Sequence, residues 1–238
     1  MGESYSVEGR HNLAITEKAD NFTQWMYSEI KPNLRGNILE IGSGIGTYSK
    51  KIVRDFKDSR IVLSDIDQDF VSRLSAAYRG NGQVSSLRID LTLASDLKQI
   101  KHQVDSVFAL NVLEHIEHDT RALENVYRLL PKGGRFVILV PAHMSLFNCI
   151  DTAVGHYRRY SKKELSEKAA AAGFRVMKSY YFNLPGIFGW YINGSLLKKK
   201  TLNEGAMGFY DRMIPLVKHA ERIILRKAGL SIIMVLEK

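Results

Sequence analysis

Short apolar runs alternate with amphipathic stretches along the first 140 residues of the chain. Five runs rich in isoleucine, valine and leucine are typical of buried strands: 37–41, 60–65, 84–89, 104–110 and 135–140. The stretches between them place apolar residues three or four positions apart, which predicts helices over 46–57, 67–79, about 93–100 and 114–130. Because apolar strands that alternate with helices indicate a parallel sheet covered on both faces, we expect an α/β fold.

The pattern changes after Pro141. Residues 141–160 show no clear element, and the elements predicted next are a helix over 161–172, a strand over 174–182, helices over about 186–199 and 207–227, and a last strand over 231–236. Ser161 is a suitable N-cap for the first of these helices, and Gly173 is a suitable stop. No repeat or low-complexity linker interrupts the chain, so we expect a single domain over 1–238.

A glycine-rich turn follows the first predicted strand. The sequence of residues 37–46 is Asn-Ile-Leu-Glu-Ile-Gly-Ser-Gly-Ile-Gly. A turn without side chains lets a ligand approach the backbone, and the following helix directs its N-terminal N–H groups toward that ligand. Glu40, just before the turn, makes the site less suitable for a bare phosphate and favours a ligand with a positive group.

Polar side chains follow successive strand ends, namely Glu40, Asp65, Asp90 and Asn111. Ligands of open parallel sheets bind outside the carboxyl ends of the strands, so we expect these four to converge. Asp65 lies 23 residues after Gly42, a spacing at which a carboxylate binds ribose hydroxyls. Asp90 can accept from the amine of a base, and Ile66 and Leu91 can lie on either side of a purine. Together these residues predict a nucleoside site.

These motifs resemble the class I S-adenosylmethionine-dependent methyltransferases, in particular the small-molecule enzymes similar to bacterial methyltransferase types 11 and 12. The resemblance rests on the turn Glu40–Gly46, the acidic pair in Asp65-Ile66-Asp67, Asp90, and the run Asn111-Val112-Leu113-Glu114-His115. It implies a three-layer α/β sandwich with a seven-stranded, mostly parallel, Rossmann-like sheet and an antiparallel last strand. It also implies a cofactor-binding core over 36–141 and a helical substrate cap built from 141–160 and 183–228.

The resemblance also implies roles for individual residues. Glu40 and the turn residues Gly42, Ser43, Gly44 and Gly46 would hold the methionine moiety of S-adenosylmethionine. Asp65 would bind both ribose hydroxyls, Ile66 would stack on adenine, and Asp90 would contact the adenine amine. Asn111 and Val112 would line the methionine side near the sulfonium. Asp65 and Asn111 can also cap the helices that follow them, and capping does not exclude ligand contact.

Two other enzyme classes fit the same turn less well. A nicotinamide dehydrogenase needs glycine or alanine at the sixth position of its fingerprint, and counting from Gly42 that position is Thr47. Nucleic-acid methyltransferases that act on exocyclic amines usually carry an Asn/Asp-Pro-Pro-aromatic run after the fourth strand. Here that position holds Asn111-Val112-Leu113-Glu114.

Three histidines are candidate catalytic bases, because imidazole titrates near neutral pH. His115 follows the fourth strand, His143 follows the fifth and should face the acceptor cavity, and His156 begins the run His-Tyr-Arg-Arg-Tyr. A base is needed only for an acceptor that must lose a proton, such as a hydroxyl. The structural alternatives are a helix-start residue for His115 and an exposed loop residue for His143.

Candidate substrate-binding residues are Tyr157, Arg158, Arg159, Tyr160 and, in the cap, Trp190. Guanidinium groups suit carboxylate or phosphate, and aromatic rings suit a ring or a sugar. The structural alternative is that the arginines pair with Glu164 or Glu167 while the tyrosines pack on the sheet.

The whole excess of positive charge lies in the second part of the chain. The net charge is +9; residues 1–140 contain 18 basic and 18 acidic residues, whereas residues 141–238 contain 16 and 7. This imbalance favours an anionic substrate, membrane or nucleic acid, or else a solvated basic face. Lys198–Lys200 and the predicted helical face of Lys218, Arg222 and Arg226 make peripheral contact with an anionic membrane an open alternative to ordinary core packing.

The remaining expectations concern compartment, metal and reaction. Cys149 is the only cysteine, so neither a disulfide nor a thiol-based metal site is expected, and we expect no metal. Residues 1–13 lack a secretory apolar region and no apolar run approaches a membrane span, which favours the cytoplasm. The expected reaction is methyl transfer from S-adenosylmethionine to a small molecule, foremost at oxygen. The alternatives are an N-methyltransferase of a small heterocycle or amine, an RNA methyltransferase despite no expected nucleic-acid partner, and a non-catalytic cofactor-binding regulator.

Overall fold

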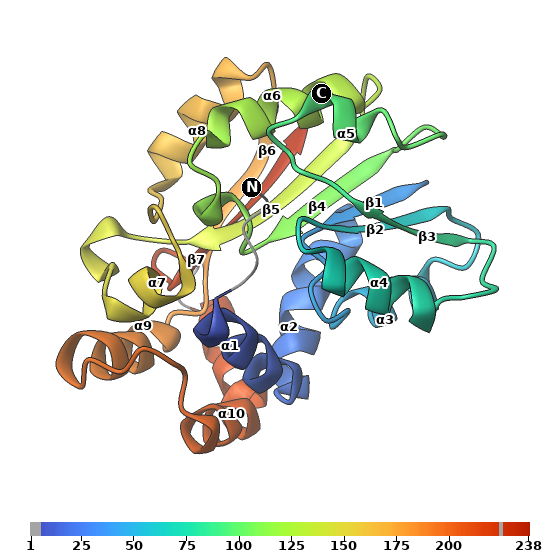
Figure 1. Ribbon diagram of the computed structural model, residues 1–238. Helices are drawn as coiled ribbons and strands as arrows, with labels where there is room; N and C mark the ends of the chain where they lie inside the picture. Colours follow the sequence, from blue (N-terminus) through green and yellow to red (C-terminus); the bar gives the residue numbers. More distant parts are fainter. Residues whose placement is uncertain (1–5, 224–225) are drawn as a thin grey trace.

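A seven-stranded sheet in the order β3-β2-β1-β4-β5-β7-β6 forms the centre of the protein (Figure 1). The computed structural model describes residues 6–223 and 226–238. The strands are β1 (Ile38–Ile41), β2 (Ile61–Asp65), β3 (Val84–Arg88), β4 (Ser106–Leu110), β5 (Arg135–Pro141), β6 (Arg175–Phe182) and β7 (Ser231–Glu237). β7 runs antiparallel to both of its neighbours, and the pairs from β3 to β5 are parallel. The predicted α/β sandwich with an antiparallel last strand is therefore confirmed.

Helices cover both faces of this sheet and bury two apolar layers. One layer contains side chains of α5 (Ala94–Leu97), α6 (Asp119–Leu129) and α8 (Lys162–Ala171). The other contains side chains of α2 (Asp20–Ile30), α3 (Ser49–Asp55), α4 (Gln68–Ala77) and α10 (Glu204–Ile223). Figure 1 shows α6 and α8 on the opposite side of the sheet from α2 and α10. Every residue of β1, β2 and β4 is buried, which explains why these strands are apolar almost throughout.

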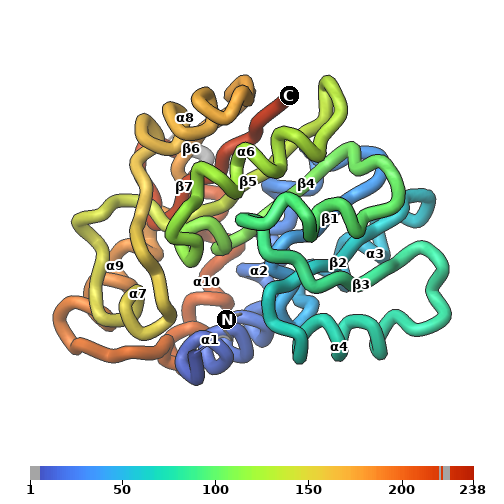
Figure 2. Tube along the Cα trace, turned by 45° about the horizontal axis from the view of Figure 1, so that its top comes forward, coloured from blue at the N-terminus to red at the C-terminus, as the bar shows by residue number. Residues whose placement is uncertain are grey.

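An N-terminal helix that the apolar pattern did not predict lies over the glycine turn. This helix is α1 (Val7–Glu17), and Figure 2 shows it between α4 and the helix α7 (Cys149–Val154). Leu13 is the nearest side chain to Gly44, and Arg10 forms an ion pair with Asp67. At the other end, the hydroxyl of Ser6 donates to the carbonyl of Ala153 at 2.9 Å. α1 therefore bridges the turn and the segment after β5.

The segment 141–160 is more ordered than its sequence suggested. It contains a short 3₁₀ turn, η3 (Met144–Leu146), and α7, so the expectation of no clear element was wrong. Asn148 and Asp151 begin α7 with a reciprocal capping box, and Gly155 ends it with φ 82°. The capping box is a sequence signal for this helix start that was missed.

The second part of the cap contains three helical elements. They are α9 (Gly186–Trp190), a π-helical segment η4 (Tyr191–Leu196), and α10. Residues 224–225 lie outside the described residues, as does the side chain of Arg222. Arg226 follows α10 with φ 55° and pairs with Glu29 at 2.8 Å, so it does not extend the basic helical face. None of the described helices is long and apolar enough to cross a membrane.

Candidate functional site

A cavity of about 680 Å³ lies where the carboxyl ends of β1, β4 and β5 meet the cap. From the sheet it is lined by Glu40, Gly42, Asn111 and Pro141, among others. Helices α1, α2, α9 and α10 form the remaining walls and contribute Leu13, Met26, Trp190 and Met207. The cavity therefore joins the glycine turn directly to the cap, as expected for a ligand site at strand ends.

The glycine turn has a backbone that favours glycine at three positions, Gly42, Gly44 and Gly46. Gly42 has φ 70° and Gly44 has φ 51°, values in the left-handed region. A Cβ on Gly42 would also collide with the Cγ2 of Val112, so the turn and the segment after β4 lie in direct contact. Ser43 N–H donates to the carbonyl of Ser64 at 2.9 Å, which fixes the turn against β2.

Glu40 is a buried carboxylate in the cavity wall. It is 2% exposed, and Ser49 Oγ donates to its Oε2 at 2.5 Å. Burial raises the pKa of Glu40 to about 8, against the opposing effect of hydrogen bonds from Ser49 and Ser43. The nearby carboxylate of Asp65 raises it further. A cationic ligand group beside Glu40 would favour its ionised form, so the donor set fits a molecule with an ammonium or sulfonium group and not a free phosphate.

The raised pKa of Glu40 predicts a pH-dependent stability. Since its pKa is about 4.5 unfolded and about 8 folded, the folded state binds more protons between these values and loses stability as the pH rises. We expect the free energy of unfolding to fall by several kcal/mol, on the order of 1.4 per pKa unit, in urea titrations from about pH 5 to pH 8. Glu40→Gln should flatten this slope relative to Glu8→Gln. Parallel slopes in the two variants would contradict the assignment.

Asp65 supports the turn from the end of β2. It is 2% exposed, accepts from Gly44 N–H at 2.8 Å through Oδ2, and accepts from Asp67 N–H at 3.0 Å through Oδ1. Burial is the first cause of its raised pKa. Asp65 does not itself line the cavity, and its neighbour Asp67 pairs with Arg10 of α1. Its ribose contact stays a prediction.

The residues expected around a purine are only partly placed as expected. Asp90 Oδ1 accepts from the backbone N–H and the hydroxyl of Thr92, at 2.8 and 2.7 Å, and so holds a turn. Ile66 is half-buried, but the side chain of Leu91 is buried in the core, so the expectation that it packs on a purine was wrong. Asn111, with φ 53°, lines the cavity beside the turn.

Two of the three candidate histidines lie at the cavity. His115 and His156 line it, with ring centroids 4.6 Å apart in an edge-to-face arrangement. Burial, together with the nearby His156, lowers the pKa of His115 to about 3, so His115 is neutral and a weak base. His143 does not line this cavity; its ring stacks on Tyr181 with centroids 4.9 Å apart. The expectation that His143 faces the cavity was therefore wrong.

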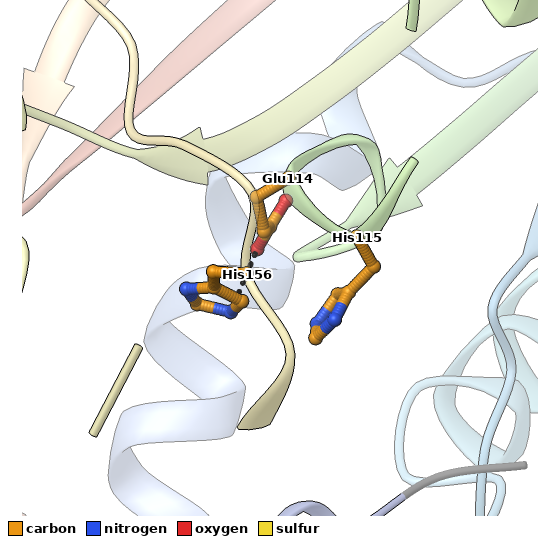
Figure 3. A group of neighbouring side chains, drawn as sticks. All are labelled: Glu114, His115 and His156. Atoms are coloured by element: carbon orange, nitrogen blue, oxygen red, sulfur yellow. Dashed lines mark ion pairs between the residues drawn. The ribbon is translucent and has the colours of Figure 1, made fainter. Parts of the chain in front are cut away.

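His156 lies between two carboxylates that had no predicted role, Asp151 and Glu114. Figure 3 shows its ion pair with Glu114. Its Nδ1 is 2.7 Å from Asp151 Oδ1, and its Nε2 is 3.8 Å from Glu114 Oε1. Glu114 is fully buried, and neither of its carboxylate oxygens has a hydrogen-bond partner among the described residues. Burial raises the pKa of Glu114 to about 7. Glu114 directly precedes His115, but nothing in the sequence indicated that its side chain would turn toward the segment after α7.

Arg159 is the guanidinium that reaches the cavity. It is 2% exposed, its Nε donates to both oxygens of Asp151 at 2.9 and 3.0 Å, and its Nη1 donates to the carbonyl of Ala142 at 3.2 Å. The Trp190 ring lies 4.6 Å from this guanidinium, and both residues line the cavity. Burial raises the pKa of Asp151, but the bond with His156 and the charge of Arg159 outweigh it and lower the value.

Two of the other three predicted substrate residues, Arg158 and Tyr160, form structural contacts away from the cavity. Arg158 Nη1 lies 3.1 Å from Asp119 Oδ2, and Tyr160, fully buried, donates to the same oxygen at 2.8 Å. Tyr157 is 43% exposed. None of these three side chains lines the cavity. The expected substrate contacts of Arg158 and Tyr160 were therefore wrong, and their acidic partner is Asp119, not Glu164 or Glu167.

Comparison with known proteins connects this site to one family. The sequence model of a family described as methyltransferase domain matches residues 39–136. A malonyl-[acyl-carrier protein] O-methyltransferase of Ilyobacter polytropus is 22% identical over 85% of this chain and 80% of its own length. A ubiquinone/menaquinone biosynthesis C-methyltransferase of Rickettsia prowazekii is 25% identical over 45% of each chain, so this chain spans about half of that relative.

Solved structures show the same fold at low sequence identity. A methyltransferase of Haloferax volcanii, solved in complex with the Trm112 methyltransferase activator, superposes with a TM-score of 0.63. It is 16% identical, and the match covers 99% of both chains. The likeness therefore extends beyond residues 39–136 to include the cap and the antiparallel strand.

Proposed function

Because this chain belongs to the class I S-adenosylmethionine-dependent methyltransferases, we propose that it methylates an oxygen atom of an anionic small molecule held beneath the cap. The observation that carries the proposal is the continuous cavity between the glycine turn and the cap. Its sheet end has the chemistry for a methyl donor, and its cap end has histidine, arginine and tryptophan side chains. Donor and acceptor would therefore meet in one enclosed space.

In the first half of the proposal, the core formed by residues 36–141 binds S-adenosylmethionine, the methyl donor. Glu40 and the turn residues Gly42, Ser43, Gly44 and Gly46 hold the methionine part. Asp65 binds the ribose, Ile66 packs on the adenine and Asp90 contacts the adenine amine. Asn111 and Val112 lie on the sulfonium side. Glu40 supports this assignment most directly, since its buried carboxylate complements a positive group. Bound there, S-adenosylmethionine would supply an electrophilic methyl group to the acceptor oxygen, with the sulfur as leaving group.

The chain's own contribution is to position the reactants and to exclude water. Phe22, Met26 and Tyr48 line the cavity together with Met207 and Tyr210 of α10, and the ring centroids of Phe22 and Tyr210 lie 6.1 Å apart. Apolar walls of this kind lower the local dielectric and keep water from competing with the acceptor. α1 closes the side of the turn through Leu13. The single domain 1–238, with its cap from 141–160 and 183–228, is thus proposed as one catalytic unit.

In the second half of the proposal, His115, His156 and Arg159 lie against the methyl acceptor. An oxygen acceptor that starts as a hydroxyl must lose its proton, and the two histidines line the wall where that oxygen would lie. Arg159, with Trp190 against it, supports an acceptor that has a carboxylate or phosphate and an apolar part. One of the two named relatives is an O-methyltransferase and the other is a C-methyltransferase. The choice of oxygen as the methylated atom therefore rests on these side chains.

We extend the proposal to a cytoplasmic enzyme whose cap touches anionic membranes. Among the described residues of 183–228, eight large apolar side chains are exposed: Phe188, Tyr191, Ile192, Leu196, Leu197, Phe209, Met213 and Leu216. Lys198–Lys200 lie among them and are exposed. An apolar surface beside lysines suits the interface of an anionic bilayer, and would bring a lipophilic acceptor to the cavity.

The test combines donor binding with methyl transfer to a lipid extract. Purified protein should bind S-adenosylmethionine with micromolar affinity in calorimetry, and should transfer radiolabelled methyl groups to a component of an anionic lipid extract presented in vesicles. It should also float with vesicles of phosphatidylglycerol and not with phosphatidylcholine alone. Tight NADH binding without S-adenosylmethionine binding would overturn the donor. Label in purified RNA, with salt-sensitive binding, would favour the RNA methyltransferase, and no transfer to any fraction would favour a regulator.

A further inference from the structure

We propose that Glu114, His115 and His156 form a binding site for one divalent first-row metal ion of the zinc class, on the cavity wall beside the acceptor. The three side chains come from two segments far apart in the sequence, the turn after β4 and the segment after α7, and converge in Figure 3. Each offers one ligand atom, and these atoms lie within 4.8 Å of one another. Two imidazole nitrogens and a carboxylate are a common ligand set for catalytic zinc, with positions left open for water or substrate.

The carboxylate of Glu114 is the strongest part of this argument. It is fully buried, and neither oxygen has a hydrogen-bond partner among the described residues. A buried carboxylate without partners is costly, so buried carboxylates are paired or coordinate metals. Arg159, the nearby guanidinium, is not hydrogen-bonded to Glu114, because its Nε donates to both oxygens of Asp151 at 2.9 and 3.0 Å. A cation between Glu114 and the histidines would complement the remaining charge.

Each of the two histidines has a hydrogen-bond contact at its ring of the kind that usually orients a metal-ligating histidine. A ligating histidine holds its second ring nitrogen against a carboxylate or a backbone carbonyl, which fixes the tautomer and directs the first nitrogen at the metal. The Nδ1 of His156 lies 2.7 Å from Asp151 Oδ1, which leaves its Nε2 directed toward Glu114 at 3.8 Å. The ring of His115 forms a hydrogen bond with the backbone of Gly155.

The geometry needs only small side-chain movements. Ligand atoms about 2.1 Å from a tetrahedral zinc ion lie roughly 3.4 Å apart, so a separation of 4.8 Å would have to close by about 1.4 Å. Rotation about the outer bonds of Glu114 and of the two histidines can supply this. The expectation of no metal rested on the single cysteine, and that argument does not apply to nitrogen and oxygen ligands.

This site would deepen the proposed function, on which its catalytic role rests. His115 and His156 both line the cavity, so an open coordination position would face the acceptor. An acceptor hydroxyl that coordinates the metal through oxygen has a lowered pKa; its O–H bond breaks, the electron pair stays on oxygen and the proton leaves to solvent. The histidines would then act as ligands and not as proton acceptors.

The experiment titrates the metal-free full chain with Co²⁺ and Zn²⁺. We expect one equivalent of Co²⁺, the visible absorption bands of a four- or five-coordinate site, and displacement by Zn²⁺. Glu114→Gln should weaken binding at least about a hundredfold, more than a lost outer contact does. Glu117→Gln, an exposed carboxylate three residues later, should bind as the wild type does. His156→Gln is the second variant if Glu114→Gln does not fold.

Two results would overturn the site. One is wild-type protein that binds neither ion stoichiometrically, and the other is Glu114→Gln and His156→Gln proteins that bind with wild-type affinity. Methyl transfer by metal-free enzyme at the full rate would also exclude the catalytic metal, while leaving the proposed function intact. Failure to bind S-adenosylmethionine would instead remove the proposed function, whatever the Co²⁺ titration shows.

Discussion

Replacement of Asp65 by Asn is expected to weaken S-adenosylmethionine binding on the order of a hundredfold. In the proposed complex one carboxylate accepts from both ribose hydroxyls, and hydrogen bonds to a charged group contribute about 1.5–3 kcal/mol each. The same carboxylate accepts from the N–H groups of Gly44 and Asp67, so it also fixes the turn that faces the donor. An amide offers a single acceptor oxygen and directs an NH₂ group at one of these donors. Calorimetry on both proteins measures the dissociation constants.

A matched control separates the ribose contact from general effects of charge. Asp58 is an exposed aspartate on the same half of the sheet, and Asp58→Asn should leave the dissociation constant within about twofold. Thermal unfolding of both variants identifies any loss of fold. A folded Asp65→Asn protein that binds the donor within threefold of the wild type would show that Asp65 is only a structural residue of the turn.

Replacement of Arg159 by Met is expected to destabilise the protein by about 3–5 kcal/mol, the range for the removal of one partner of a buried ion pair. Arg159 is 2% exposed and donates to both oxygens of Asp151, which is itself fully buried. Without the guanidinium, Asp151 and Glu114 would be two buried carboxylates with one imidazole between them. Urea denaturation near neutral pH measures the change, and methyl transfer should be lost in parallel.

The adjacent arginine is the natural control. Arg158 pairs with Asp119 at 3.1 Å, but its side chain is 23% exposed and Lys168 pairs with the same aspartate. Arg158→Met should therefore cost about 1 kcal/mol or less. Arg159→Lys keeps the charge but loses the contact of Nε with both Asp151 oxygens. Its loss of stability should therefore lie between those of Arg159→Met and Arg158→Met. Equal stabilities of Arg159→Met and Arg158→Met would contradict the central role given to Arg159.

The donor half of the protein was predicted well because its signals are local. Each strand from β1 to β5 lies within two residues of the predicted range, since strands buried on both faces are apolar throughout. The glycines of the turn reflect backbone requirements at Gly42 and Gly44 that no distant residue sets. Glu40 and Asn111 line the cavity because they lie at the carboxyl ends of β1 and β4, and position along the chain sufficed to place them.

The acceptor half was predicted less well because its site is made of contacts between distant segments. The run 155–161 was read as one ligand-binding surface, but backbone geometry directs Arg159 toward the cavity and Arg158 and Tyr160 toward Asp119. His143 follows β5 as expected, yet with φ 63° its ring lies against Tyr181. Glu114 and Asp151 have no distinctive spacing to His156, so only the fold shows that they flank it.

The sequence by itself determined the sheet, the glycine turn and the resemblance to one family of methyl-donor enzymes. These depend on hydrophobic periodicity and on backbone conformations that only certain residues adopt, both of which are local properties. The tertiary structure alone decided which histidines reach the cavity, which arginine faces it, and that α1 covers the turn. These outcomes depend on the direction of side chains from segments separated by tens of residues, which packing sets only once the chain is folded.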